Sequence, residues 1–163
     1  MMRTIGRLIG WSEKFAAFSL IVLVALVVYD ALMRYLFQAG SVALQELEWH
    51  LFDIVILLSI GYTFSQDAHV RVDLFYEHFS EKTKALINLI GSVVFVLPFS
   101  CLIIYLGLDY VSMSFVQMEA SADPGGLPYR FIIKSFIPLS FVLMVLQTFR
   151  VIVASWHTIQ KGQ

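Results

Sequence analysis

Apolar and charged residues alternate in long blocks along this chain. Four stretches are almost wholly apolar, and charged or turn-forming residues separate them. The stretches run over about residues 15–34, 47–66, 85–108 and 131–153. Each has close to the roughly 20 residues that a helix needs to cross a hydrocarbon core. The pattern predicts an all-α integral membrane protein with four transmembrane helices.

The first 14 residues carry three basic side chains around a short apolar set, a spacing that suits a helix lying in the membrane interface. A basic start before an apolar run is also typical of a signal peptide. Here the run is long, no good small-residue cleavage site follows it, and Asp30 and Arg34 continue the helix. We therefore expect a short interfacial N-terminal helix that leads into the first span, within a single membrane domain of residues 1–163.

Composition supports the membrane assignment. The chain is 59% hydrophobic and 14% charged, whereas soluble domains are about 45–50% apolar and about 25% charged. A net charge of −1 leaves no basic field for nucleic acid. Cys101 is the single cysteine, which excludes a disulfide within one chain.

Lys and Arg side chains are unevenly distributed between the two ends of the predicted spans. If the N terminus is inside, the cytoplasmic side holds Arg3, Arg7, Lys14, Arg71, Lys82, Lys84, Arg150 and Lys161. The other side then holds Arg34, Arg130 and Lys134. By the positive-inside rule, the N and C termini are both predicted to be cytoplasmic.

Ionisable residues share a face on each of the first two spans. Glu46, His50 and Asp53 fall at positions i, i+4 and i+7 of the second span. Charged groups are costly near lipid and turn inward or toward a partner, so this face is not expected to point at lipid. Asp30 and Arg34 stand four apart on the first span and are expected to pair, either as a boundary anchor or as a contact to another subunit.

Small residues mark two further places. One is a stripe on the third span, of the kind that lets helices approach closely in lipid. The stripe consists of Asn88, Gly91, Ser92 and Phe95. The other is the sequence DPGGLPYR before the fourth span, in which two prolines and two glycines prescribe a turn, with positive φ available at Gly125 and Gly126.

The titratable residues point to no cofactor, metal site or enzyme activity. The four histidines provide no pair at matching depth inside the bundle, as a haem would require, and no Cys or His cluster has zinc-ligand spacing. No nucleophile stands with a base. Every acid is assigned near an interface, whereas a transporter acting alone usually carries an ionisable residue near the bilayer midplane. A self-contained small homo-oligomeric transporter or channel stays open as the alternative, with the membrane anchor of a redox complex behind it.

The second span and the segment after it resemble the small membrane subunit (DctQ type) of TRAP transporters, the tripartite ATP-independent periplasmic family. The matching residues are Glu46 or Glu48, Gly61, and the run His69, Val70, Arg71, Val72 and Asp73. Four spans with both termini inside also fit, so the resemblance covers essentially the whole chain. The DPGGLPYR segment with Lys134 and Pro138 is similar to a subset of the family that has a longer second periplasmic loop.

The resemblance implies a multi-pass protein of the bacterial inner membrane. Its partners would be the large TRAP membrane subunit, which carries the substrate and sodium sites, and a periplasmic protein that binds an organic acid. The small subunit would serve as a scaffold for the large one and would help to dock the binding protein.

On this interpretation we assign roles to two sets of residues. Those expected at the subunit interface or in structural polar contacts are Asp30, Arg34, Glu46, Glu48, His50, Asp53, Gly61, Asp67, His69, Arg71, Asp73 and Asn88. For residues 67–73, salt bridges within this chain alone are the alternative. Those expected to form the periplasmic docking turn are Asp123, Pro124, Gly125, Gly126, Pro128, Tyr129 and Arg130.

Overall fold

The structure, a computed structural model, describes residues 2–65 and 79–161. The described residues are all helix and connecting loop, and four helical rods are long and apolar enough to cross a membrane, as predicted. In chain order the elements are α1 (Met2–Leu36), α2 (Val42–Ser65), α4 (Glu81–Gly91), η1 (Ser92–Val96), α5 (Leu97–Val116), α6 (Phe131–Lys134) and α7 (Phe136–Lys161). The side on which the termini lie stays a prediction. So does the interfacial position of the first residues, which are continuous with the first span.

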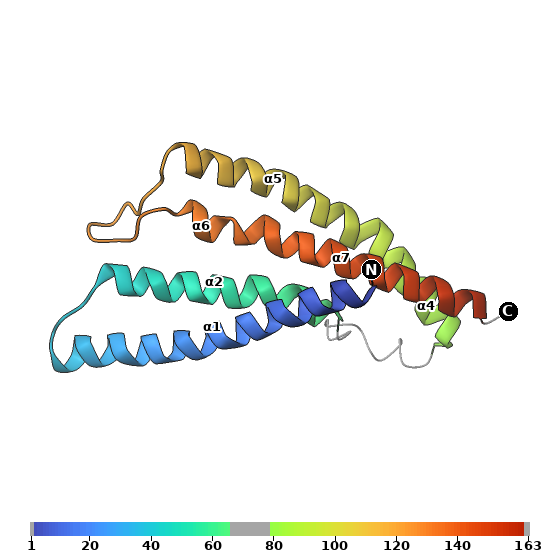
Figure 1. The fold of residues 1–163 in the computed structure, drawn as a ribbon, viewed down its shortest axis with the longest axis horizontal. Helices are drawn as coiled ribbons and strands as arrows, with labels where there is room; N and C mark the ends of the chain where they lie inside the picture. The colour runs from blue at the N-terminus through green and yellow to red at the C-terminus, as the bar shows by residue number, and fades with distance from the viewer. Residues whose placement is uncertain (1, 66–78, 162–163) are drawn as a thin grey trace.

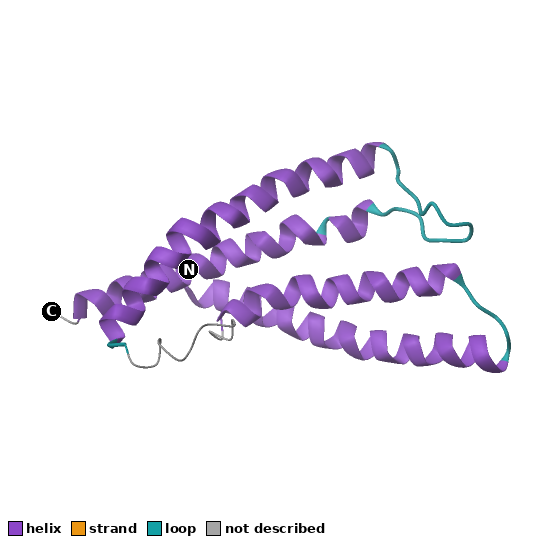
Figure 2. Cartoon of the chain, turned by 180° about the vertical axis from the view of Figure 1, so that it is seen from behind, coloured by secondary structure: helices purple, strands orange, loops and turns teal. Residues whose placement is uncertain are grey.

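The helices form two hairpins that diverge toward one end (Figure 1). One hairpin is α1 with α2, and the other is α5 with α6 and α7. Residues 37–41 join α1 to α2, and residues 117–130 join α5 to α6. Both connections lie at the diverging end, which we call the loop end. At the opposite end α4 and the start of α1 lie against α7, and the view from behind in Figure 2 shows the same wedge. The two hairpins are therefore held together mainly away from the loop end.

Small and polar side chains occupy the helix contacts, and large apolar ones point outward. The buried polar residues are Ser19, Asp30, Glu46, Ser92, Ser100, Ser114, Ser140, Gln147, Thr148 and Ser155. By contrast, Phe18 and Tyr105 are 63% and 67% exposed. Helices in lipid associate through close packing and hydrogen bonds rather than through hydrophobic burial, because lipid tails are as apolar as leucine. The distribution is that of a membrane bundle.

The third helical rod, which consists of α4, η1 and α5, keeps one buried stripe along its length, although its helix type changes. The stripe is formed by Ala85, Ser92, Ser100, Gly107 and Ser114. Successive members are seven residues apart, except for a step of eight between Ser92 and Ser100. A seven-residue repeat returns a side chain to the same face of a helix, so the longer step contains one additional residue.

A single π-helical turn absorbs this residue. It spans Ser92–Val96, and the Leu97 N–H donates to the Ser92 carbonyl five positions back. Pro98 lies two residues beyond its end, where the missing N–H and the ring disfavour regular α-helix. The expected stripe is therefore partly wrong: Ser92 is buried, but Phe95 is 69% exposed and a Cβ at Gly91 would meet nothing within 4 Å. Beyond the π-helical turn, the buried face continues through Ser100 and Gly107.

The third helical rod also continues beyond the predicted span, so the following connection covers residues 117–130. No helix-breaking residue lies between Asp109 and Val116, and α5 ends only where Met118 adopts a φ of 46°. There the Met118 N–H donates to Phe115 O at 3.0 Å and the Glu119 N–H to Ser114 O at 3.0 Å. These two bonds form a Schellman motif, which satisfies carbonyls at a helix end.

Candidate docking groove and hairpin at the loop end

Residues 117–130 form a compact hairpin. Two backbone bonds close it: the Arg130 N–H donates to Glu119 O at 2.9 Å, and the Ser121 N–H to Leu127 O at 3.0 Å. Loops with paired backbone groups are more restricted than open ones, because the bonds limit φ and ψ on both sides. The hairpin therefore has a defined shape at the end of the bundle.

The tip of the hairpin is the turn that the sequence predicted. The Gly126 N–H donates to Asp123 O at 3.0 Å, and Gly125 has a φ of 83°. Proline at the second position and glycine with positive φ at the third are the features of a type II turn. Gly125 is exposed, and a Cβ there would meet nothing within 4 Å. Glycine is therefore favoured at this position by the positive φ and not by lack of room.

Glu46 fastens this hairpin to α2. Its carboxylate accepts hydrogen bonds from the Ser121 hydroxyl, from the Leu127 N–H at 2.6 Å and from the Arg130 guanidinium at 3.2 Å. Glu46 is only 8% exposed. A Cβ at Gly126 would lie 2.8 Å from Glu46 Oε2, so only glycine leaves room for the carboxylate. One acid in the first turns of α2 thus holds a loop more than 70 residues away in sequence.

A second ion pair braces the base of the hairpin. The Lys134 ammonium, at the end of α6, donates to the Glu119 carboxylate and lies 3.9 Å from the centroid of the Tyr110 ring. The hydrogen bond from Lys134 lowers the pKa of Glu119, which lies in the hairpin outside the spans, below its ordinary value of 4.5. Ammonium over an aromatic face is a favourable contact, so α5, α6 and the hairpin are held together here.

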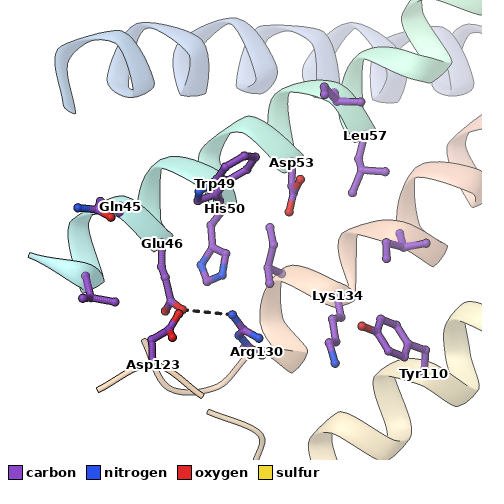
Figure 3. A pocket seen from close by; sticks show the side chains of 14 residues that line it. Gln45, Glu46, Trp49, His50, Asp53, Leu57, Tyr110, Asp123, Arg130 and Lys134 are labelled. Atoms are coloured by element: carbon purple, nitrogen blue, oxygen red, sulfur yellow. Dashed lines mark hydrogen bonds and ion pairs between the residues drawn. The ribbon is translucent and has the colours of Figure 1, made fainter. Parts of the chain in front are cut away.

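Between α2 and α6 lies an open groove of about 600 Å³ (Figure 3). It is lined by Val42, Gln45, Glu46, Trp49, His50, Asp53, Ile56, Leu57, Tyr110, Asp123, Arg130, Ile133, Lys134 and Ile137. Figure 3 shows His50 and Asp53 pointing from α2 toward α6, beside the pair of Glu46 and Arg130. The three residues predicted to share a face of the second span therefore all face this groove.

Asp53 lies about midway along α2, and not in its first turns as Glu46 does. The second helix begins at Val42 and has 24 residues. With a rise of 1.5 Å per residue, Asp53 is about 16 Å along a helix of about 36 Å. Position along a helix does not give depth in a bilayer, so the expectation that every acid lies near an interface stays a prediction.

Residues 23–158 match the family described as tripartite ATP-independent periplasmic transporters, DctQ component. The chain belongs to this family. No curated protein matches the chain significantly. DctQ proteins are the small membrane subunits of TRAP transporters, a transporter component rather than an enzyme family. The family and the four apolar helices make this a multi-pass membrane protein whose partners are the other two components of a tripartite system.

Not all of the polar residues predicted on this DctQ chain come together. Asp30 and Arg34 form the expected ion pair four residues apart on α1, but neither lines the groove. Asp30 is 2% exposed, and its second carboxylate oxygen has no hydrogen-bond partner among the described residues. The ionisable residues on the first two spans therefore form two separate sites, Asp30 with Arg34 on α1 and the groove-lining residues of α2.

The other predicted interface residues are scattered. Glu48 has one buried carboxylate oxygen that finds no hydrogen bond in the described part of the chain. Gly61 is buried, and a Cβ added to it would lie 3.6 Å from Leu143 Cβ. It therefore belongs to the contact between α2 and α7. Asn88 is half-buried on α4. The remaining four, Asp67, His69, Arg71 and Asp73, lie outside the described residues.

Sequence reasoning missed the residues that complete the site. Ser121 and Leu127 meet Glu46, and Glu119 meets Lys134, across separations of 75, 81 and 15 residues. No periodicity relates positions at these separations, so no local signal could have paired them. Over residues 2–65 and 79–161, no three His, Cys, Asp or Glu residues gather closely enough to hold a metal ion.

Proposed function

We propose that this DctQ chain is the stationary scaffold of a sodium-coupled TRAP transporter that takes up organic acids. In this scheme the large membrane subunit carries the substrate and sodium ions, and the small subunit gives it a wider hold in the bilayer. The arrangement of the two hairpins supports the proposal. They join at one end and diverge at the other. They present large apolar side chains outward along the spans, and between α2 and α6 a groove lined by both charged and apolar side chains.

The hairpin of residues 117–130 is the part proposed to help dock the periplasmic binding protein. With both termini in the cytoplasm, as the distribution of Lys and Arg predicts, the loop end faces the periplasm. The hairpin is held at its base by Glu46 with Arg130, while Asp123 and Gly125 at its tip are exposed. A pre-shaped loop pays less ordering entropy on binding than a flexible one, which suits a surface that repeatedly meets a soluble partner.

Affinity purification tests the scaffold role. The tagged chain is expressed with its operon neighbours, extracted in mild detergent, and the recovered proteins are identified by mass spectrometry. A large polytopic membrane protein in constant ratio supports the proposal. Recovery of the chain alone as a homo-oligomer would refute it and would favour a self-contained transporter or channel.

Uptake measurements test the docking role separately. Gly126→Val places a side chain against Glu46 and distorts the hairpin, so uptake should fall while membrane insertion and co-purification with the large subunit persist. Gly40→Val is the matched control, because Gly40 lies in the other loop at the same end and its Cβ direction is open. Normal uptake by the Gly126 variant would show that the hairpin is only a connection.

A further inference from the structure

Asp53 places a carboxylate about midway along a membrane-spanning helix, without a cation beside it. It is exposed in the groove, and within the described ranges it forms no ion pair. His50, one turn earlier, is the ionisable neighbour with which it interacts electrostatically. Within a membrane-spanning helix an ionised carboxylate is costly unless a cation or water reaches it. The site is therefore incomplete in the isolated chain.

The two cations that line the groove are already engaged. Arg130 bonds to Glu46, and Lys134 bonds to Glu119 and lies against the ring of Tyr110. Three carboxylates line the same groove, those of Glu46, Asp53 and Asp123. The groove therefore has an unbalanced negative charge, to which Asp53 and Asp123 contribute, because neither forms an ion pair among the described residues.

The groove also has walls suited to the stem of a long basic side chain. Around Asp53 stand Ile56 and Leu57 from α2, with Ile133 and Ile137 from the opposite rod. Lys and Arg bury their methylene stems along apolar surface while their charged heads reach a polar group. An acidic group beside apolar walls thus matches such a residue in both charge and shape.

We infer that this groove receives a Lys or Arg side chain from a membrane helix of the large transport subunit, with its charged head on the Asp53 carboxylate. The inference rests on the proposed scaffold function and names the chemistry of the contact. Because the cation comes from the partner, the pair forms only in the complex. The same contact excludes lipid from the wedge between α2 and α6.

Co-purification of Asp53 variants tests this contact. Asp53→Asn keeps the shape and removes the charge, and Asp53→Glu keeps the charge. Asp109→Asn is the matched control, since Asp109 is an exposed acid on α5 that does not line the groove. Truncating one partner of a desolvated charge pair costs enough to weaken binding about thirtyfold or more, so the Asn variant should lose the large subunit in a dilution series. The Glu variant and the Asp109 variant should retain it.

Each outcome has one meaning. If the wild-type chain does not recover a large subunit, the scaffold function fails and this inference with it. If the wild type recovers it and Asp53→Asn recovers it equally well, the scaffold function stands and the ion pair is refuted.

A photoreactive amino acid at Ile56, which lines the groove and leaves Asp53 in place, identifies the occupant directly. Crosslinking to the large subunit supports the inference. Crosslinking only to lipid, or only to a second copy of this chain, overturns it.

Discussion

Among the glycines within the described helices, Gly107 of α5 has the tightest surroundings, where it meets Pro138 of α7. A Cβ at Gly107 would lie 3.3 Å from Pro138 Cδ and 3.5 Å from its Cβ, and the proline ring cannot rotate away. Gly107→Ala gains about 1 kcal/mol of helix propensity. Overpacking of a close contact costs about 1–3 kcal/mol. The expected net effect is from neutral to about 2 kcal/mol destabilising.

Two other glycines provide internal controls, because the propensity gain is common to all three. A Cβ at Gly91 would meet nothing within 4 Å, and one at Gly61 would make an ordinary contact at 3.6 Å with Leu143. Apparent Tm in mild detergent, from circular dichroism at one scan rate, should therefore fall in the order Gly91→Ala, Gly61→Ala, Gly107→Ala. The first and last should differ by about 2–4 °C for each kcal/mol of overpacking. If Gly107→Ala melts at or above Gly91→Ala, the tight contact with Pro138 is refuted.

Three further predictions concern the hairpin. Glu46→Gln removes the charge that holds three donors, so trypsin should cleave after Arg130 severalfold faster in detergent, and equal rates would contradict the fastening role. Because the pKa of Glu119 is lowered in the folded chain, its contribution to stability is present above pH 4.5 and is lost as the pH falls through the lowered pKa. The Tm advantage of wild type over Glu119→Gln at pH 7 should thus shrink at acid pH, and it should be smaller in the Lys134→Gln background. Met118→Gly relieves a φ of 46° at the helix end and should raise stability by about 1 kcal/mol, read as a higher Tm; an unchanged or lower Tm would refute strain there.

Much of the loop end could be read locally. The turn at residues 123–126 follows from proline and glycine at adjacent positions, and the shared face of Glu46, His50 and Asp53 follows from helical spacing. Both predictions are confirmed by the geometry. What each of these acids does is another matter, because Glu46 is engaged within the chain while Asp53 is left without a cation in the described structure. Which of the two acids is engaged within the chain depends on where the hairpin of residues 117–130 folds back, and it folds back onto Glu46.

The third rod shows a different limit. Small residues every seven positions mark a contact face, but the π-helical turn at Ser92–Val96 moves that face by one residue. Regular helical spacing put Gly91 and Phe95 on the contact face, but a Cβ at Gly91 would meet nothing within 4 Å and Phe95 is exposed. Pro98 indicates that the helix is perturbed near this point, but not whether it bends or takes up an additional residue.

The sequence by itself determined the number of spans, the apolar exterior, the turn at the hairpin tip and the family. These depend on water-to-lipid transfer of individual side chains and on backbone preferences over a few residues, which neighbours in sequence settle. Only the tertiary structure decided that Glu46 holds residues 121–130, that Asp30 and Arg34 stand apart from the groove, and that Asp53 lies midway along α2. An ion pair requires two groups within a few ångströms, and which groups meet is decided by the packing of whole helices, to which residues far apart in sequence contribute.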